Sequence, residues 1–213
     1  FDERELDEKG IERITARNQV TVFGFACDQT PDLMPMPVWL ANRLSRRLDL
    51  ARHEKELPYL EPDCKVQVGI DFRDRTPRRV HGVTVTASQR SRGKPSLKVL
   101  QRDIQEAVVE PVLAESGLRF DKKTRIFVNP GGPIVGGGPS THSGLTGRKS
   151  AVDTYGEYSR HSGDALSGKD PLRIDRVGAY AARYAAKSVV AAGLARECEV
   201  AVSYSIGLST PVS

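Results

Sequence analysis

KVQVGIDFRDRTPRRVHGVTVTAS, residues 65–88, contains two runs of alternating apolar and polar residues, joined by the polar segment RDRTP. In the first run, Val66, Val68, Ile70 and Phe72 fall on one face, and RRVHGVTVTAS then alternates again. Such alternation is typical of a strand that buries one of its faces. The short polar connection between the two runs therefore predicts an antiparallel pair of strands.

The segments on either side of this pair continue the pattern. SLKVLQRDIQEAVVEPVLAESG (96–117) repeats apolar residues at helical spacing, carries Pro111 near its last turns and ends at Gly117. TRIFVN (124–129) returns as a strand, and VWLANRLSRRLDLAR (38–52) is predicted as an amphipathic helix with one buried stripe. The order strand, strand, helix, strand defines a ββαβ-type unit.

A similar pattern is predicted near the two ends of the chain. QVTVFGFA (19–26) and CEVAVSYSIG (198–207) alternate like strands, and RVGAYAARYAAKSVVAAGLA (176–195) has helical spacing, with Asp175 as its predicted N-cap and Gly193 at its end. We therefore predict a two-layer α+β protein. Its repeated ββαβ-type units have mixed or antiparallel sheets that helices cover on one face.

Three segments are expected along the chain. Residues 1–26 are interpreted as the remnant of an N-terminal domain, and 27–135 as a central ββαβ-type domain. Residues 136–213 combine a glycine-rich loop for phosphate with the helix and strand of a further ββαβ-type domain. The first residue is Phe1 and the acidic opening FDERELDEKG reads like the middle of a chain, so we expect a piece of a longer polypeptide.

Composition narrows the class of protein. With 28% charged and 38% hydrophobic residues, the 213-residue chain has the balance of a globular protein. Its net charge of +5 suits an anionic partner. Only 6% of the residues are aromatic, and no aromatic ladder accompanies the arginine-rich segments, which argues against nucleic acid. No apolar run reaches membrane-spanning length, and three widely spaced cysteines without a CxxC pair favour a reducing cytoplasm.

Glycine and fixed positive charge coincide in GGPIVGGGPSTHSGLTGRKS (131–150). A P-loop is rejected, because Arg148 separates the last glycine from Lys149 and no parallel strand-to-helix arrangement is expected. The physical basis of phosphate binding by a P-loop still applies to this segment. Glycine lets backbone N–H groups approach phosphate oxygens, arginine supplies a forked donor and lysine supplies a point charge. Downstream, SGKDPLRIDR adds cations beside carboxylates that suit Mg²⁺. Alternatively, the glycines only form turns and the charges are solvated.

Three long segments carry a resemblance to a known family: GLTGRKSAVDTYG, HSGDALSGKDPLRIDR and GAYAARYAAKSVVAAGLARECEVAVSYSIG. Together with NPGGPIVGGGP, ELPYLEPDCKVQV and VFGFACDQTPDLMPMP, they resemble the S-adenosylmethionine synthetases over nearly the whole chain. The resemblance implies three similar domains, Mg²⁺ and K⁺, and an active site between two subunits of a homodimer or homotetramer. It also implies that ATP and methionine combine, with release and hydrolysis of tripolyphosphate.

The resemblance assigns roles to seven positions. Those that match catalytic contacts to the phosphate chain are Lys65, Arg148, Lys149 and Lys169. Asp63 and Ala165 match positions that line the ATP site, and Asp175 matches a Mg²⁺ ligand, with the helix cap as its alternative role.

Five positions depart from the family pattern. Asn18 stands where an aspartate is usual, and Pro133 and Ile134 replace an arginine and a phenylalanine near the adenine. His142 replaces an aspartate that contacts the amino group of methionine, and Arg173 replaces a lysine. Ile134, His142 and Arg173 are therefore candidate substrate-binding residues. The changes concentrate around adenine and amino acid, whereas the phosphate-binding set is intact.

Three functions stay open. The first is methionine adenosyltransferase. The second is a divergent relative that uses another thioether or only hydrolyses polyphosphate, since imidazole cannot replace a carboxylate as the partner of an ammonium group. The third is a non-catalytic, nucleotide-binding regulatory subunit. The family's HPDK segment belongs to an N-terminal domain that residues 1–18 do not replace, and its presence upstream in the full-length polypeptide would favour catalysis.

Overall fold

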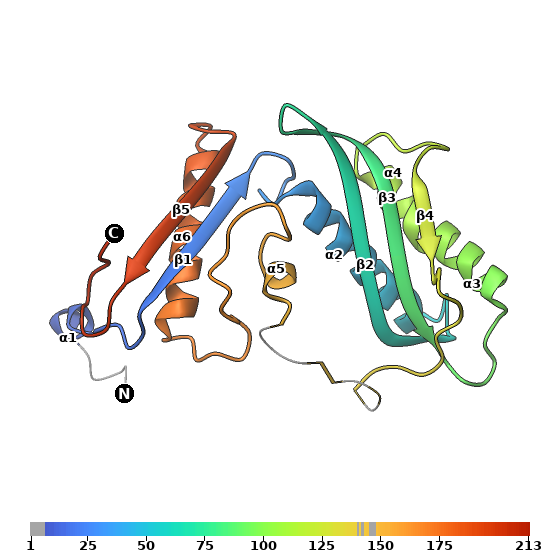
Figure 1. The fold of residues 1–213 in the computed structure, drawn as a ribbon, viewed down its shortest axis with the longest axis horizontal. Coiled ribbons are helices and arrows are strands. Elements are labelled where there is room, and N and C mark those ends of the chain that lie inside the picture. Colours follow the sequence, from blue (N-terminus) through green and yellow to red (C-terminus); the bar gives the residue numbers. More distant parts are fainter. Residues whose placement is uncertain (1–6, 140, 142, 145–147) are drawn as a thin grey trace. The chain divides into compact units, whose positions relative to one another are not determined.

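The computed structural model describes residues 7–139, 141, 143–144 and 148–213. It divides into two compact units (Figure 1), the first made of Phe1–Pro35 with Thr146–Ser213 and the second of Met36–Leu145. Both units combine helices with a sheet, which confirms the α+β prediction. None of the helices in the described ranges combines the length and the apolar character needed to cross a bilayer.

The second unit is built on the predicted hairpin. β2 (Leu60–Arg73) pairs antiparallel with β3 (Thr76–Gln89), so the prediction for this pair is confirmed. At the tip, Asp74 and Arg75 both have positive φ, of 50° and 59°, as a turn that matches the right-handed twist of the strands requires. β4 (Arg125–Val128) joins β3 in parallel and makes the sheet mixed.

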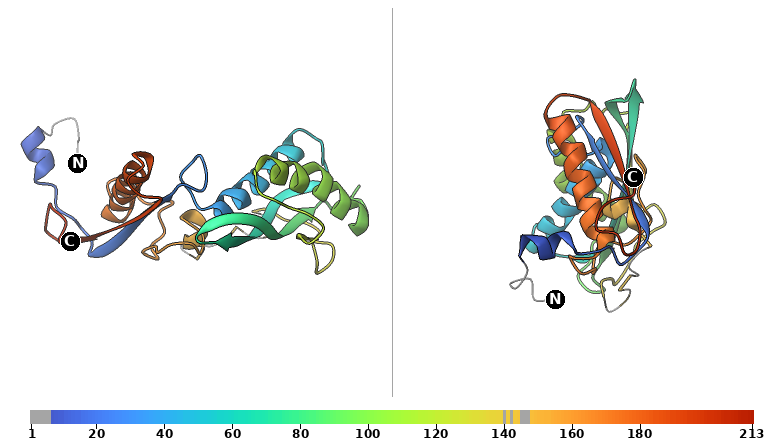
Figure 2. Two further views of the ribbon diagram at one scale, coloured as in Figure 1. Left: turned by 90° about the horizontal axis from the view of Figure 1, so that it is seen from above. Right: turned by 90° about the vertical axis from the view of Figure 1, so that its left-hand side faces the viewer.

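Helices cover one face of this sheet, as Figure 2 shows for α2 (Met36–His53) and α3 (Leu97–Ile104). The chain continues from α3 through a π-helical turn, Gln105–Val109, into α4 (Glu110–Glu115). The π-turn ends two residues before Pro111, which has no N–H and would press its ring against the carbonyl four residues back in a regular helix. Fully buried side chains fill the space between the layers, among them Leu40, Leu44, Leu100, Ile104, Val83 and Val85.

The first unit has a smaller sheet with a single long helix on one face (Figure 1). β1 (Val20–Cys27) pairs antiparallel with β5 (Glu197–Tyr204), although the two strands come from opposite ends of the chain. α6 (Ile174–Ala191) packs on this pair and buries Ala182 and Ala186. Two short helices, α1 (Glu8–Glu12) and α5 (Ser150–Asp153), complete the unit.

The two ends of α6 test two predictions. At the C-terminal end, Gly193 has a φ of 71° and donates its N–H to the carbonyl of Val190, while Leu194 donates to that of Val189. This is the Schellman arrangement, so the prediction that Gly193 ends the helix is confirmed. At the N-terminal end the cap is Arg173, not Asp175. The predicted cap is wrong, because Asp175 lies inside the helix and its carboxylate has other partners.

Candidate functional site

The predicted site residues fall in both units. The first unit holds Arg148, Lys149, Ala165, Lys169, Arg173 and Asp175. The second unit holds Asp63, Lys65, Pro133 and Ile134. His142 lies outside the described residues.

The best-defined cluster in the first unit surrounds the carboxylate of Asp175. Lys169 Nζ donates to Asp175 Oδ2 at 2.6 Å, and Asn18 Nδ2 donates to Asp175 Oδ1 at 2.7 Å. The Asp175 side chain is only 3% exposed, whereas that of Lys169 is 25% exposed. Asp164 Oδ1 lies 4.0 Å from the same ammonium nitrogen. The cluster thus presents one partly open cation above a buried carboxylate.

Local structure holds these side chains in place. Asp175 is the second residue of α6, where the positive end of the helix dipole favours a carboxylate. The loop before α6 is closed by Asp170, whose carbonyl accepts from the Arg173 N–H at 3.0 Å. In addition, Arg176 Nη1 donates to the carbonyl of Lys169 at 2.6 Å. The KDPLRIDR segment is therefore a fixed turn that leads into the helix.

Opposing effects set the protonation of Asp175. Burial by itself raises the pKa of this carboxyl group, but hydrogen bonds from Lys169 and Asn18, with the positive charges of Lys169 and Arg173, bring the pKa below its ordinary value. The carboxylate is therefore ionised at neutral pH. A buried carboxylate with a lysine partner is stable only while both partners remain, because removing one leaves an uncompensated charge.

The carboxylate oxygens of Asp175 can contribute one ligand to a Mg²⁺ ion. From the residues that the structure describes, each Asp175 oxygen accepts one hydrogen bond and keeps a second lone pair, so the carboxylate fits as one ligand of Mg²⁺. Among the described residues, no group of three or more His, Cys, Asp or Glu side chains is placed to hold a metal. Since Mg²⁺ is commonly held by one or two carboxylates together with substrate phosphates, a single carboxylate is compatible with a phosphate-bound ion.

The Arg148 and Lys149 pair lies immediately before α5, and both residues are exposed. The first residue of α5, Ser150, donates from Oγ to the carbonyl of Gly163 at 3.1 Å. This bond ties the start of α5 to the loop that contains Ala165, two residues farther along the chain. The structure thus brings the predicted phosphate-binding pair next to the predicted nucleotide-lining loop.

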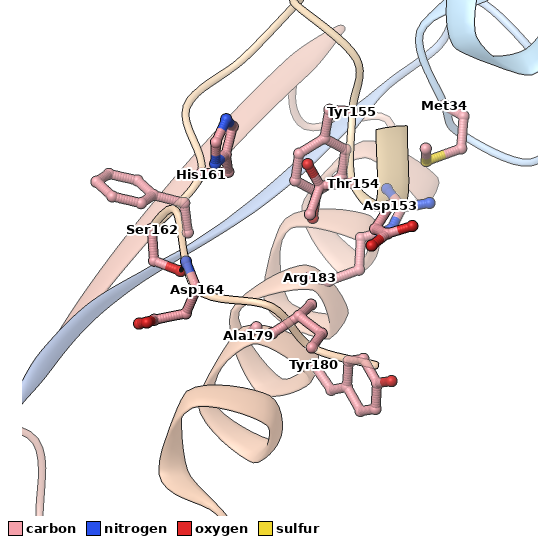
Figure 3. Close-up of a pocket in the computed structure, with 12 residues that line it drawn as sticks. Met34, Asp153, Thr154, Tyr155, His161, Ser162, Asp164, Ala179, Tyr180 and Arg183 are labelled. Atoms are coloured by element: carbon pink, nitrogen blue, oxygen red, sulfur yellow. Dashed lines mark hydrogen bonds between the residues drawn. The ribbon is translucent and has the colours of Figure 1, made fainter. Parts of the chain in front are cut away.

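A cavity of about 190 Å³ lies beside this loop within the first unit. Figure 3 shows that it is enclosed by the loop with His161 and Asp164, by Tyr155 after α5, and by α6 with Arg183. Asp164 and Leu166, on either side of Ala165, both line it. Arg183 is held in place by its bonds to the carbonyls of residues 25, 32 and 33.

In the second unit, Asp63 and Lys65 lie on β2. Lys65 pairs in register with Thr86 and is exposed on the sheet face opposite the helices, because its neighbours Cys64 and Val66 pack against the core. The carbonyl of Asp63 accepts from Ser88 Oγ at 3.1 Å. These contacts place both predicted residues at one end of the β2 and β3 pair.

The glycine-rich loop after β4 passes along the same end of the sheet. Gln89, the last residue of β3, donates its N–H to the carbonyl of Ile134 at 2.9 Å and accepts from the Gly136 N–H at 2.9 Å. A Cβ on Gly137 would lie 2.3 Å from Ser88 Oγ and 2.9 Å from Asp63 Cβ, so only glycine fits. The structure therefore brings Asp63 and the Ile134 loop together, and Ile134 is 40% exposed.

Sequence reasoning missed two residues of the Asp175 cluster, Asp164 and Asn18. Asn18 is separated from Asp175 by 157 positions, and the sequence marks it only as a departure from a family pattern. Neither spacing nor periodicity relates two residues that far apart. The contact forms because Asn18 precedes β1 and Asp175 begins α6, which packs on β1.

Comparison with known proteins accounts for both units. Residues 13–134 match the model of the S-adenosylmethionine synthetase central domain, and residues 136–213 match that of the C-terminal domain. The central-domain match includes β1, which pairs with β5 of the C-terminal match.

Curated relatives named S-adenosylmethionine synthase are similar along the chain. That of Synechococcus sp. (strain JA-3-3Ab) is 48% identical over 219 residues, covering 100% of this chain and 53% of the relative. That of Trichormus variabilis is 49% identical over 217 residues, covering 99% of this chain and 52% of the relative. The chain spans about half the length of the curated relatives it matches. It belongs to the S-adenosylmethionine synthetase family.

Proposed function

We propose that the polypeptide carrying this chain is a methionine adenosyltransferase, which makes S-adenosylmethionine from ATP and methionine and then hydrolyses the released tripolyphosphate. The curated relatives carry the name of this activity. The observation that bears most on the proposal is the buried Asp175 carboxylate, which holds the partly exposed ammonium group of Lys169 next to the turn that starts α6. A held cation of this kind suits a phosphate ligand.

Charge stabilisation is the main contribution that we assign to these residues. Tripolyphosphate gains negative charge as it leaves, and fixed cations lower the energy of that state most when they need no rearrangement. We assign this role to Lys65, Arg148, Lys149 and Lys169. The methionine sulfur attacks C5′ of ATP directly, so the protein supplies position rather than a nucleophile.

The remaining assignments follow the same proposal. Asp63 and Ala165 line the ATP site, Asp175 is one ligand of Mg²⁺, and the ion supplies further charge neutralisation for the phosphates. Ile134, His142 and Arg173 contact the adenine or the amino acid. K⁺ is the second cation that the active protein requires, beside Mg²⁺. The active protein is a homodimer or homotetramer in the cytoplasm.

The arginine at position 173, where the family usually has a lysine, is compatible with the proposed substrate. An arginine keeps the positive charge of the usual lysine and offers a planar fork to a carboxylate or phosphate. Its charge also contributes to the lowered pKa of Asp175. The change at His142 is of a different kind, because imidazole does not pair with an ammonium group as a carboxylate does. This favours another thioether as the alternative substrate.

The test uses the intact polypeptide with ATP, Mg²⁺, K⁺ and methionine, and follows S-adenosylmethionine by mass and phosphate by a separate assay. Both products are expected. Phosphate without the sulfonium product would contradict the methionine assignment and support another thioether or the hydrolase. Neither product, with nucleotide still bound, would support the regulatory subunit.

A matched pair of variants assigns any activity to the site. K169M removes the cation held by Asp175 and is expected to lower the rate by about 100-fold or more, in the range for loss of one preorganised charge contact. K187M makes the same change at an exposed position of α6 and is expected to leave the rate unchanged. Equal effects of the two variants would contradict the role of Lys169.

A further inference from the structure

The side chain of Asn18 has a defined orientation in the Asp175 cluster. Its Oδ1 accepts the backbone N–H of Gln19 at 2.9 Å, and this leaves Nδ2 as the end that faces Asp175 at 2.7 Å. The amide therefore acts as a donor toward the carboxylate. Because Asn18 comes just before β1, the strand fixes the position from which the amide approaches α6.

The neutral amide determines the charge balance of the cluster. Asp175 carries one negative charge and is paired with the Lys169 ammonium group at 2.6 Å, while Asp164 lies farther from that ammonium group, at 4.0 Å. An acid at position 18 would bring two carboxylate oxygens to about the distance that now separates Asn18 Nδ2 from Asp175 Oδ1, and such a pair needs a shared proton or a bound cation. The identity of residue 18 thus decides whether the cluster demands an additional cation.

We propose that Asn18 is a positioning residue, which orients the Asp175 carboxylate toward Lys169 and keeps the affinity of the cluster for divalent cations low in the absence of phosphate. The inference rests on the proposed function, because the placement of Lys169 matters to a ligand only if phosphate binds there. In this arrangement Asp175 Oδ1 accepts a hydrogen bond from Asn18, and Oδ2 accepts one from the lysine. The ammonium group of Lys169, whose side chain is 25% exposed, is then held where it can contact an anion.

The experiment compares N18D, N18A and the unmodified protein with two probes. Mn²⁺ alone, in place of Mg²⁺, is titrated by electron paramagnetic resonance, and tripolyphosphate is titrated by calorimetry without divalent cations. N18D is expected to bind Mn²⁺ about tenfold more tightly and tripolyphosphate about tenfold more weakly, in the range for changes to residues that orient ligands. N18A is expected to weaken tripolyphosphate binding without a gain for Mn²⁺.

Q29E is the matched control. Gln29 follows β1 at its other end, and its Nε2 lies 3.4 Å from Glu197 Oε1, so this variant also brings two acids together. It is expected to change neither titration. Circular dichroism checks folding. If N18D does not fold, N18S, which keeps a short donor, is compared with N18A and is expected to bind tripolyphosphate more tightly.

The outcomes separate the two proposals. Equal Mn²⁺ and tripolyphosphate affinities in N18D and the unmodified protein, or equal tripolyphosphate affinities in N18S and N18A, would overturn the role of Asn18. If the unmodified protein does not bind tripolyphosphate, the phosphate assignment of the proposed function fails. The Mn²⁺ comparison would then still decide whether Asn18 governs the cation affinity of Asp175.

Discussion

Gly24 on β1 lies directly against the backbone of Ala182 on α6: a Cβ added to the glycine would be 2.0 Å from the Ala182 carbonyl carbon. No side chain fits between strand and helix there. The same approach of helix to strand brings the start of α6, with Asp175, next to Asn18 at the start of β1. The glycine is therefore a requirement of the fold that positions the candidate site.

G24A is expected to destabilise the protein by about 3 kcal/mol, because the added methyl group meets helix backbone, which cannot turn aside as a flexible side chain would. Urea unfolding measures the change. G69A is the control, since a Cβ on Gly69 in β2 has its nearest neighbour at 3.8 Å, an ordinary contact. If G69A lowers the stability as much as G24A does, the clash with the helix backbone is not the cause of the loss.

G137A is expected to weaken ATP binding by about tenfold, because the new Cβ would displace the loop from Ser88 and Asp63. Binding is measured by calorimetry with a non-hydrolysable ATP analogue. G131A is the matched control in the same loop, since a Cβ there meets nothing within 4 Å. If both variants bind the analogue like the unmodified protein, the close approach of Gly137 to Ser88 and Asp63 has no part in the proposed nucleotide site.

Y59F is expected to cost about 1 kcal/mol of stability, because the hydroxyl of Tyr59 donates to Asp103 Oδ2 at 2.7 Å within the second unit. Urea unfolding at pH 7 measures the loss. The comparison variant is Y184F, whose hydroxyl belongs to a side chain that is 76% exposed on α6. A similar cost for Y184F would argue against the Tyr59 contact as the cause.

The contribution of Asp103 to the stability of the folded protein depends on pH. Burial raises the pKa of its carboxyl group, but hydrogen bonds from Tyr59 and Arg102 and the charge of Arg102 bring it below the ordinary value of 3.8. The folded state thus favours the ionised form. The resulting stability is present above about pH 3.8 and is lost as the pH falls through the lower value of the folded state. The stability difference between the unmodified protein and D103N should therefore shrink between pH 7 and pH 3.

Cys27 is expected to resist thiol reagents in the folded protein. Burial raises the pKa of its thiol from 9.0 to about 11, and its side chain is fully buried. At pH 8 this lowers the thiolate population by about 100-fold. Alkylation followed by mass spectrometry should label Cys198, which is half-buried, well before Cys27. Equal rates for the two thiols would contradict the packing of β1.

Local patterns in the sequence predicted the second unit well. The alternation in residues 65–88 predicted the β2 and β3 pair, because a strand that buries one face must alternate and a short connection forces neighbouring strands to pair. The end of α6 at Gly193 was predicted for a similar reason, since its φ of 71° is strained for other residues. The glycine-rich loop and its cations are likewise evident from residue types and their spacing alone.

Tertiary structure alone decided the relationships between distant segments. The pairing of β1 with β5 and the bond between Asn18 and Asp175 join positions more than 150 residues apart. Periodicity carries no information about such contacts, which depend on how α6 packs on the sheet. The same packing explains why Asp175 is not a helix cap. Its buried carboxylate is turned to Lys169 and Asn18, so these tertiary contacts replace the local preference for a cap. The sequence thus determined the elements and the charges near the site, and packing decided which of those charges meet.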